Sequence, residues 1–155
     1  MLVDLGRNDL GKISNFDSVE VTKYMMIHRY SKIMHICSQV ESNIRSDCDG
    51  LSAIESVLPA GTLSGAPKIR ACEIIEELES EQRGIYGGAL GYLDFTGNLD
   101  TCIAIRMAVK KDGHVYVQAG GGIVADSIPD NEYMESYNKA LAVMNAVKNA
   151  KEVLE

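Results

Sequence analysis

Two short turn sequences, at residues 96–98 and 111–113, restrict the fold of this chain more than any other feature. Each contains a glycine next to Asn or Asp, and together they separate three predicted β segments at residues 87–95, 99–110 and 114–124. Connections this short join antiparallel neighbours. The three segments are therefore predicted to form an antiparallel meander.

Three further segments, before this meander, have a β-like or mixed pattern. Residues 16–21 are predicted to be a short strand, and residues 35–44 alternate between two faces as a strand does. Residues 23–34 are rich in Met, Ile and Tyr without clean periodicity, so their structure stays open at this point.

Three helices complete the predicted set of elements. Residues 51–58 form a short helix that Pro59 stops, and residues 66–79 carry an apolar stripe at spacings of three. Residues 131–154 form a long helix whose inward side chains are predicted to be Met134, Leu141, Met144 and Val147. The predicted fold class is α+β, with an antiparallel β-sheet and flanking helices.

Length and composition limit the classes of protein to which the chain could belong. With 155 residues and 46% apolar content, the chain is predicted to be one domain, residues 1–155, with a real core. The net charge of −7 argues against nucleic-acid binding, which needs clustered Lys and Arg. There is no apolar run of the ~20 residues that span a membrane and no secretory signal, so a soluble, cytoplasmic protein is expected. The four cysteines lack metal-type spacing and are expected to be reduced and mostly buried: Cys37, Cys48, Cys72 and Cys102.

The loop at residues 59–68 brings two glycines, two hydroxyl groups and a helix N-terminus together. Free N–H groups and the positive end of a helix dipole can bind an anion. A plain connection between two helices, built from good turn residues, explains the same sequence. Both interpretations stay open from the residues alone.

Gly120, Gly121 and Gly122 stand together at the end of the last predicted strand. Consecutive glycines are costly in a strand, because each loses backbone entropy and packs no side chain. They indicate either a bulge or a close approach to a ligand, such as a carboxylate held by main-chain N–H groups. Their spacing is not that of a dinucleotide-binding fingerprint.

The last helix carries charged residues at helical spacing. Glu132 and Glu135 are three residues apart and share a face, so both carboxylates could meet one hard cation such as Mg²⁺. Lys139 follows Glu135 by four residues, which is also the order of an ordinary solvated ion pair. The two explanations compete.

Two single residues are further candidates. In the predicted strand 99–110, alternation places Arg106 on the face of Ala104 and Ala108, where small side chains leave room for a guanidinium and a carboxylate ligand. Arg106 could equally pair internally with Asp100. His35 is a candidate proton donor, although a lone histidine is more often structural.

Six motifs in register resemble the chorismate-utilising enzymes, a family that includes anthranilate, aminodeoxychorismate, isochorismate and salicylate synthases. The motifs lie at residues 2–10, 34–38, 59–68, 84–92, 103–106 and 118–127, and the resemblance covers essentially the whole chain. The loop at 59–68 resembles the amine-forming branch. Residues 100–106 and 117–120 are more similar to anthranilate synthase than to aminodeoxychorismate synthase.

This resemblance implies roles for individual residues. His35 corresponds to the family's active-site histidine, implicated in proton transfer. Glu135 matches a Mg²⁺ ligand, and Glu132 lies beside it. The residues matching positions that contact the substrate or its pyruvate product are Thr62, Tyr86, Arg106, Gly120, Gly121, Gly122 and Lys139.

The resemblance also implies an activity and partners. The reaction is a lyase reaction of the anthranilate synthase type, in which chorismate and ammonia give anthranilate and pyruvate with Mg²⁺ as cofactor. A glutamine amidotransferase subunit would supply ammonia, and the family's N-terminal portion is absent, so the chain is expected to be the C-terminal part and inactive alone. Two alternatives remain open: aminodeoxychorismate as product, or a non-catalytic remnant that acts as a binding or assembly module.

Overall fold

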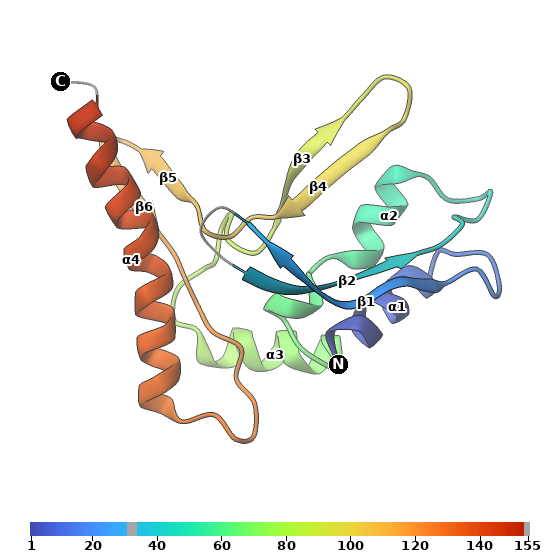
Figure 1. The fold of residues 1–155 in the computed structure, drawn as a ribbon, viewed down its shortest axis with the longest axis horizontal. Helices are drawn as coiled ribbons and strands as arrows, with labels where there is room; N and C mark the ends of the chain where they lie inside the picture. The colour runs from blue at the N-terminus through green and yellow to red at the C-terminus, as the bar shows by residue number, and fades with distance from the viewer. Residues whose placement is uncertain (31–33, 154–155) are drawn as a thin grey trace. The chain divides into compact units, whose positions relative to one another are not determined.

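The structure is a computed structural model that describes residues 1–30 and 34–153, with side chains over residues 1–30 and 34–150 (Figure 1). Contacts divide the chain into two compact units, each described here by itself. Unit 1 comprises Met1–Glu79 and Gly91–Asp100, and unit 2 comprises Ser80–Leu90 and Thr101–Glu155. The expectation of a single domain stays a prediction.

Helices and short strands are mixed along the described chain, which confirms the α+β class. In chain order they are α1 (Leu2–Gly11), β1 (Glu20–Arg29), β2 (Met34–Glu41), α2 (Gly50–Val57), the 3₁₀ turn η1 (Gly61–Leu63), α3 (Lys68–Leu78), β3 (Ala89–Leu93), β4 (Leu99–Ile103), β5 (Ala108–Lys111), β6 (His114–Val117) and α4 (Pro129–Val153). Among the described residues, no helix is long and apolar enough to cross a membrane.

The described strands form three separate two-stranded sheets, β1–β2, β3–β4 and β5–β6, and not the one sheet that was expected. Both predicted turns are present: Asp94 N–H donates to the Asn98 carbonyl at 2.9 Å across the first, and β5 and β6 pair antiparallel across the second. The predicted strand 99–110 is wrong, because the chain leaves the extended conformation between Ile103 and Ala108. This break separates the two hairpins.

The antiparallel ribbon of β1 and β2 takes up the segment whose structure the sequence left open. The register pairs Val21 with Val40 and His28 with His35, with irregularities between Val21 and Met26. Within that bulge, Met25 has a φ of 49°, and its N–H donates to the Ser38 hydroxyl at 3.0 Å. Residues 31–33 of the open segment lie outside the described residues.

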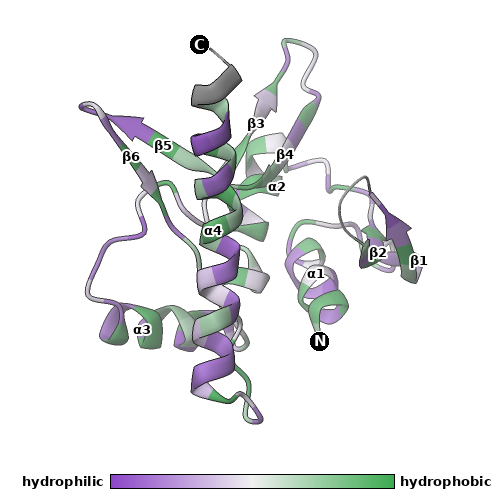
Figure 2. Cartoon of the chain, turned by 60° about the vertical axis from the view of Figure 1, so that its left-hand side comes forward, coloured by the Kyte–Doolittle hydropathy of each residue, from purple (hydrophilic) through white to green (hydrophobic). Residues whose placement is uncertain are grey.

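The predicted helices occur with small shifts at their ends. The side chain of Asp49 accepts the Ser52 N–H at 2.9 Å and forms a capping box at the start of α2; the hydrogen bonds from Ser52 lower the pKa of Asp49. Pro67 is the N-cap residue of α3, which begins at Lys68. Figure 2 shows hydrophobic and hydrophilic segments alternating along α4.

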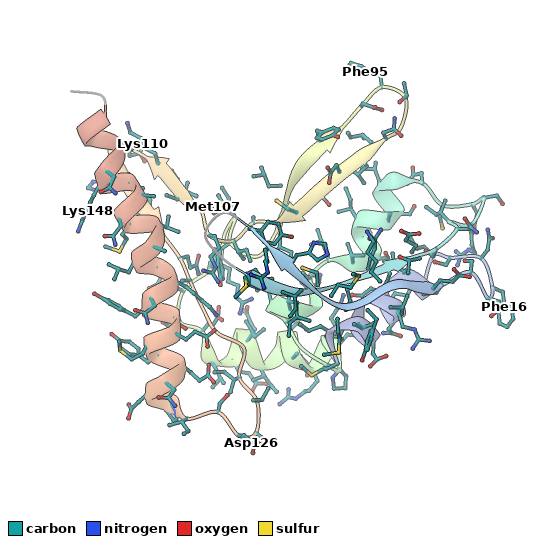
Figure 3. All side chains as sticks on the ribbon, in the orientation of Figure 1. Phe16, Phe95, Met107, Lys110, Asp126 and Lys148 are labelled. Carbon is teal, nitrogen blue, oxygen red and sulfur yellow. The ribbon has the colours of Figure 1, made fainter. Side chains whose placement is uncertain are left out.

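Very little apolar surface is buried within the described residues. Ala104 is the one apolar residue buried there, with 2% of its surface exposed, so the expected core is wrong. Every residue of β1 is exposed, since a two-stranded ribbon leaves both of its faces open. Phe16 and Phe95 lie on two loops and are fully exposed (Figure 3).

Two details of burial also differ from the sequence predictions. The four cysteines are free but not buried, since Cys102 is exposed and the other three are half-buried. Met134 and Met144, predicted to face inward on the last helix, are 49% and 42% exposed. Leu141 and Val147 on the same helix are half-buried.

Candidate functional site

A hollow in unit 2 gathers charged side chains from α4 and from the break after β4. Its volume is about 450 Å³, and it is open to solvent. The residues that line it are Arg106, Asn131, Met134, Glu135, Asn138 and Lys139. The α4 members recur at spacings of three and four, which places them on one face of the helix. Asn131 and Asn138 were not singled out from the sequence, although this spacing contains the signal.

Glu135 and Lys139 are in direct contact in this hollow, as an ion pair one helical turn apart. The hydrogen bond from Lys139 is the largest cause that lowers the pKa of Glu135, followed by the charges of Lys139 and Arg106. Glu135 is therefore ionised at neutral pH. The predicted ion pair of Glu135 and Lys139 is present, and the role of Glu135 as a metal ligand stays a prediction.

Arg106 reaches the hollow from an unusual backbone conformation. Its φ is 55°, in the left-handed region that non-glycine residues rarely adopt. The prediction that strand alternation places Arg106 beside Ala104 and Ala108 is wrong, because the residue lies in the break between β4 and β5. Within the described residues no salt bridge joins Arg106 to Asp100, whereas its charge acts on Glu135, with which it lines the hollow. Its guanidinium is available to an anionic ligand.

The three glycines follow β6, which ends at Val117, so the strand predicted to reach residue 124 is shorter than expected. A Cβ atom on Gly120 would lie 3.3 Å from the Tyr86 hydroxyl, and one on Gly121 would lie 3.2 Å from a Glu132 carboxylate oxygen. Gly122 has open space instead. Close approach therefore explains the lack of a side chain at two of the three positions.

This glycine segment is tied to α4 at two points. Lys139 Nζ donates to the Gly120 carbonyl at 3.3 Å. The Ser127 hydroxyl donates to Glu132 at 2.7 Å and accepts the Val124 N–H at 3.0 Å. Glu132 thus fixes the loop that precedes its own helix, and it is not among the residues that line the hollow. Neither spacing nor periodicity in the sequence indicated this role of Ser127.

The predicted pairing of Glu132 with Glu135 around one cation stays a prediction, although each carboxylate has another partner in this structure. Glu132 is engaged with Ser127, whereas Glu135 is engaged with Lys139. Among the described residues, no group of three or more His, Cys, Asp or Glu side chains converges on a common point. Glu135 is the one carboxylate that lines the hollow.

His35 and Thr62, the remaining candidates, belong to unit 1. His35 is exposed on β2 opposite His28 of β1, so two imidazoles lie at one position of the ribbon. Thr62 is exposed in the turn η1, where the N–H groups of Leu63 and Ser64 donate to the Ala60 carbonyl at 2.9 and 3.1 Å. Both side chains are open to a ligand.

Comparison with known proteins supplies the family. The chain is 59% identical over 153 residues to anthranilate synthase component 1 of Acetivibrio thermocellus, covering 99% of this chain and 31% of the relative. It is 56% identical over 155 residues to the same component of Pseudomonas aeruginosa, covering 100% of this chain and 32% of that one. The chain thus spans about a third of the length of these curated relatives.

Solved structures show the same fold. Anthranilate synthase component I of Streptococcus pneumoniae is similar with a TM-score of 0.88 and 53% identity, over 92% of this chain and 33% of the other. A 2,3-dihydroxybenzoate-specific isochorismate synthase of Bacillus anthracis shares the fold at 22% identity, with a TM-score of 0.83 over 95% and 39% of the two chains. The family model described as chorismate binding enzyme matches residues 1–145. The chain belongs to the chorismate binding enzyme family.

Proposed function

We propose that this chain is the part of an anthranilate synthase component I that grips chorismate and takes part in its conversion to anthranilate. The observation that carries the proposal is the hollow of unit 2, where Arg106 and Lys139 lie beside an ionised Glu135. Relatives at 51–59% identity that carry this name extend over nearly the whole chain. The reaction joins chorismate and ammonia and releases anthranilate, pyruvate and water, a lyase reaction.

Charge explains why the hollow suits this substrate. Chorismate has two carboxylates, and the chain has a net charge of −7, so local cations must overcome a repulsive overall field. Arg106 offers a planar fork of N–H donors that matches a carboxylate, and its charge also acts on the neighbouring Glu135. Lys139, held between Glu135 and the Gly120 carbonyl, adds a second positive charge.

The glycine segment and Tyr86 extend the same anion site. N–H groups at residues 120–122 can approach a ligand closely, because no side chain intervenes. The Tyr86 hydroxyl lies near Gly120 and can donate a hydrogen bond to the same end of the ligand. In the proposed reaction Arg106 binds the enolpyruvyl carboxylate. The resemblance to the family gives Thr62 a substrate contact and His35 a role in proton transfer during pyruvate loss.

Glu135 fits the role of a Mg²⁺ ligand. It is an ionised carboxylate in an open hollow, and Mg²⁺ is usually held by one or two carboxylates, with water and substrate as the other ligands. Glu132 accepts the hydrogen bond of Ser127 on Oε1, so Oε2 is its remaining oxygen for a metal. Bound Mg²⁺ would supply Lewis-acid assistance to the departing ring hydroxyl and an anchor for the ring carboxylate.

The proposal includes partners. A glutamine amidotransferase subunit supplies ammonia, in tryptophan biosynthesis in the cytoplasm. The chain also needs the remainder of component I, because it spans about 31% of the relative from A. thermocellus and leaves the faces of its ribbon exposed. Alone, it is expected to be inactive.

Complementation tests this function. The chain is mixed with the remaining part of the A. thermocellus component I, Mg²⁺, chorismate and ammonium, and anthranilate is followed by its fluorescence. The mixture is expected to form anthranilate, whereas each part alone does not. Lys139→Gln should abolish the signal, and the matched change Lys148→Gln, at an exposed position of the same helix, should leave it intact (Figure 3).

Each result of this assay has a defined meaning. Aminodeoxychorismate detected by mass would replace the proposed product. Robust turnover by the isolated chain would contradict the need for the remainder of component I. A folded complex without turnover and without protection by chorismate would favour a non-catalytic binding module.

A further inference from the structure

Asp9 is the one acidic side chain buried within the described residues, and the proposed reaction does not use it. It lies in α1, within the motif at residues 2–10, and only 4% of its surface is exposed. An isolated buried carboxylate is strongly unfavourable unless it is paired and hydrogen-bonded. Its contacts therefore indicate what it holds in place.

Two ammonium groups surround the Asp9 carboxylate. Lys68 Nζ lies 2.9 Å from each of its oxygens, and Lys12 Nζ lies 3.0 Å from one of them. Lys68 is the first residue of α3, and Lys12 follows the end of α1. The Asp9 carboxylate thus links α1 to α3, through two residues that are 59 positions apart in the sequence.

The same two lysines also cap the end of α2. Lys12 Nζ donates to the Ser56 carbonyl at 3.4 Å, and Lys68 Nζ donates to the Val57 carbonyl at 3.3 Å. The last carbonyls of a helix have no partner within the helix, so cationic side chains there satisfy them. One buried carboxylate therefore fixes the last turn of α2 and the first residue of α3.

Between these two fixed points lies the loop that carries Thr62. A Cβ atom on Gly61 would lie 3.0 Å from a methyl carbon of Leu5, so α1 also supports the middle of this loop directly. Near the far end, Gly65 has a φ of 146°, and a Cβ atom there would lie 2.9 Å from the Ala71 side chain. The loop is held at both ends and against α1, which leaves little freedom for its shape.

We propose that Asp9 is a positioning residue: through Lys12 and Lys68 it sets the shape of the loop between α2 and α3 and so places Thr62 for chorismate. The proposal rests on the proposed function only in making Thr62 a substrate contact. Its structural half is the claim that Asp9 sets the shape of this loop. That claim concerns this chain alone and is tested separately.

The structural half is tested by amide hydrogen exchange on the whole 155-residue chain. Asp9→Asn removes the charge with little change of shape, and Asp4→Asn makes the same chemical change on the same helix at a 73% exposed side chain. The amides of Leu63 and Ser64, bonded to Ala60, should exchange at least tenfold faster in Asp9→Asn and at the original rate in Asp4→Asn. Unchanged exchange in a folded Asp9→Asn chain would overturn the proposal.

The functional half is the claim that Asp9 places Thr62 for the substrate. It is tested by measuring the activity of the complemented enzyme well below its unfolding temperature. Asp9→Asn is expected to lower kcat/KM for chorismate by on the order of 10²-fold, the loss typical of a ~1 Å misplacement of a contact group. Lys68→Met should cause a similar loss, and the double variant should fall no further, because both changes release the same loop. A lower melting temperature with unchanged kcat and KM would instead assign Asp9 to folding alone and refute the positioning role.

A second pair of variants applies if Asp9→Asn does not fold. Gly61→Ala pushes the loop against Leu5, so it should lower kcat/KM, and adding Leu5→Ala should restore part of it by making room. Equal effects of Gly61→Ala with Leu or Ala at position 5 would refute the support of the loop by α1. Absence of anthranilate from the unsubstituted complex would refute the proposed function, and the exchange result would still decide the structural half.

Discussion

Replacing Arg106 by glycine is predicted to make the chain more stable than replacing it by alanine, although both changes weaken chorismate binding. Its φ of 55° lies in the left-handed region, which costs a residue with a Cβ atom roughly 1–2 kcal/mol. Strained residues persist where their side chains are needed. Removing the side chain with glycine should relieve the strain, whereas alanine should keep it.

The expected magnitude follows from comparing Arg106→Gly with Arg106→Ala, since both remove the guanidinium. At an ordinary position glycine is less stable than alanine by roughly 0.5–1 kcal/mol, because the unfolded glycine chain has more freedom. At residue 106 the order should reverse, with the glycine variant more stable by about 1 kcal/mol. For a chain of this size that corresponds to a difference in Tm of about 2–4 °C.

Thermal unfolding of the two variants measures this difference, and Asn138 supplies the matched control. Asn138 lines the same hollow from within α4, where Asn138→Ala should be more stable than Asn138→Gly by about 1 kcal/mol. Both Arg106 variants should weaken chorismate binding by about 10- to 100-fold, since a hydrogen bond to a charged group contributes ~1.5–3 kcal/mol. If alanine is the more stable replacement at both positions, Arg106 is not strained and the reasoning is refuted.

Three further predictions concern pKa values and the glycine segment. Replacing Lys139 by methionine should raise the pKa of Glu135 toward its usual value of 4.5, because the Lys139 hydrogen bond is the largest cause of its lowering; a carboxyl titration by NMR measures this. Hydrogen bonds from Thr96 and Asn98 lower the pKa of Asp94 from 3.8 to about 2. The contribution of Asp94 to the free energy of unfolding is therefore present above pH 3.8 and is lost as the pH falls toward 2. This loss of stability in acid should be smaller in Asp94→Asn. Gly121→Ala places a methyl group against a carboxylate oxygen of α4 and should lower Tm by a few degrees, whereas Gly122→Ala, with open space, should not.

Local sequence signals predicted α2, α3, α4 and both turns, whereas α1 was not predicted. The residue types at the ends of α2 and α3, including Pro59 after α2, predict helix limits within two residues of those observed. Such signals depend on neighbours in sequence, so they survive whatever packs around them. The same holds for Glu135 and Lys139, whose contact follows from the helical repeat.

Features that depend on backbone exceptions or on distant contacts were missed. Alternation along residues 99–110 gave no sign that Arg106 adopts a positive φ and ends the strand pattern. The helical repeat also placed Glu132 beside Glu135, but the Ser127 hydroxyl draws Glu132 toward the glycine segment. The buried ion pair of Asp9 and Lys68 joins positions too far apart in sequence for any periodicity to reveal.

The openness of the hollow explains why the chain is expected to be inactive alone even though it carries the charged residues. Two unit charges 4 Å apart interact by about 1 kcal/mol in water, but by about 4 kcal/mol at the effective dielectric of a protein surface, ~20. Arg106 is exposed, so its attraction for a chorismate carboxylate stays near the lower figure. Covering the hollow by the remainder of component I would strengthen each contact without moving any of these residues. Binding by the isolated chain should therefore be weak and strongly weakened by salt; tight, salt-independent binding would show that the hollow needs no cover.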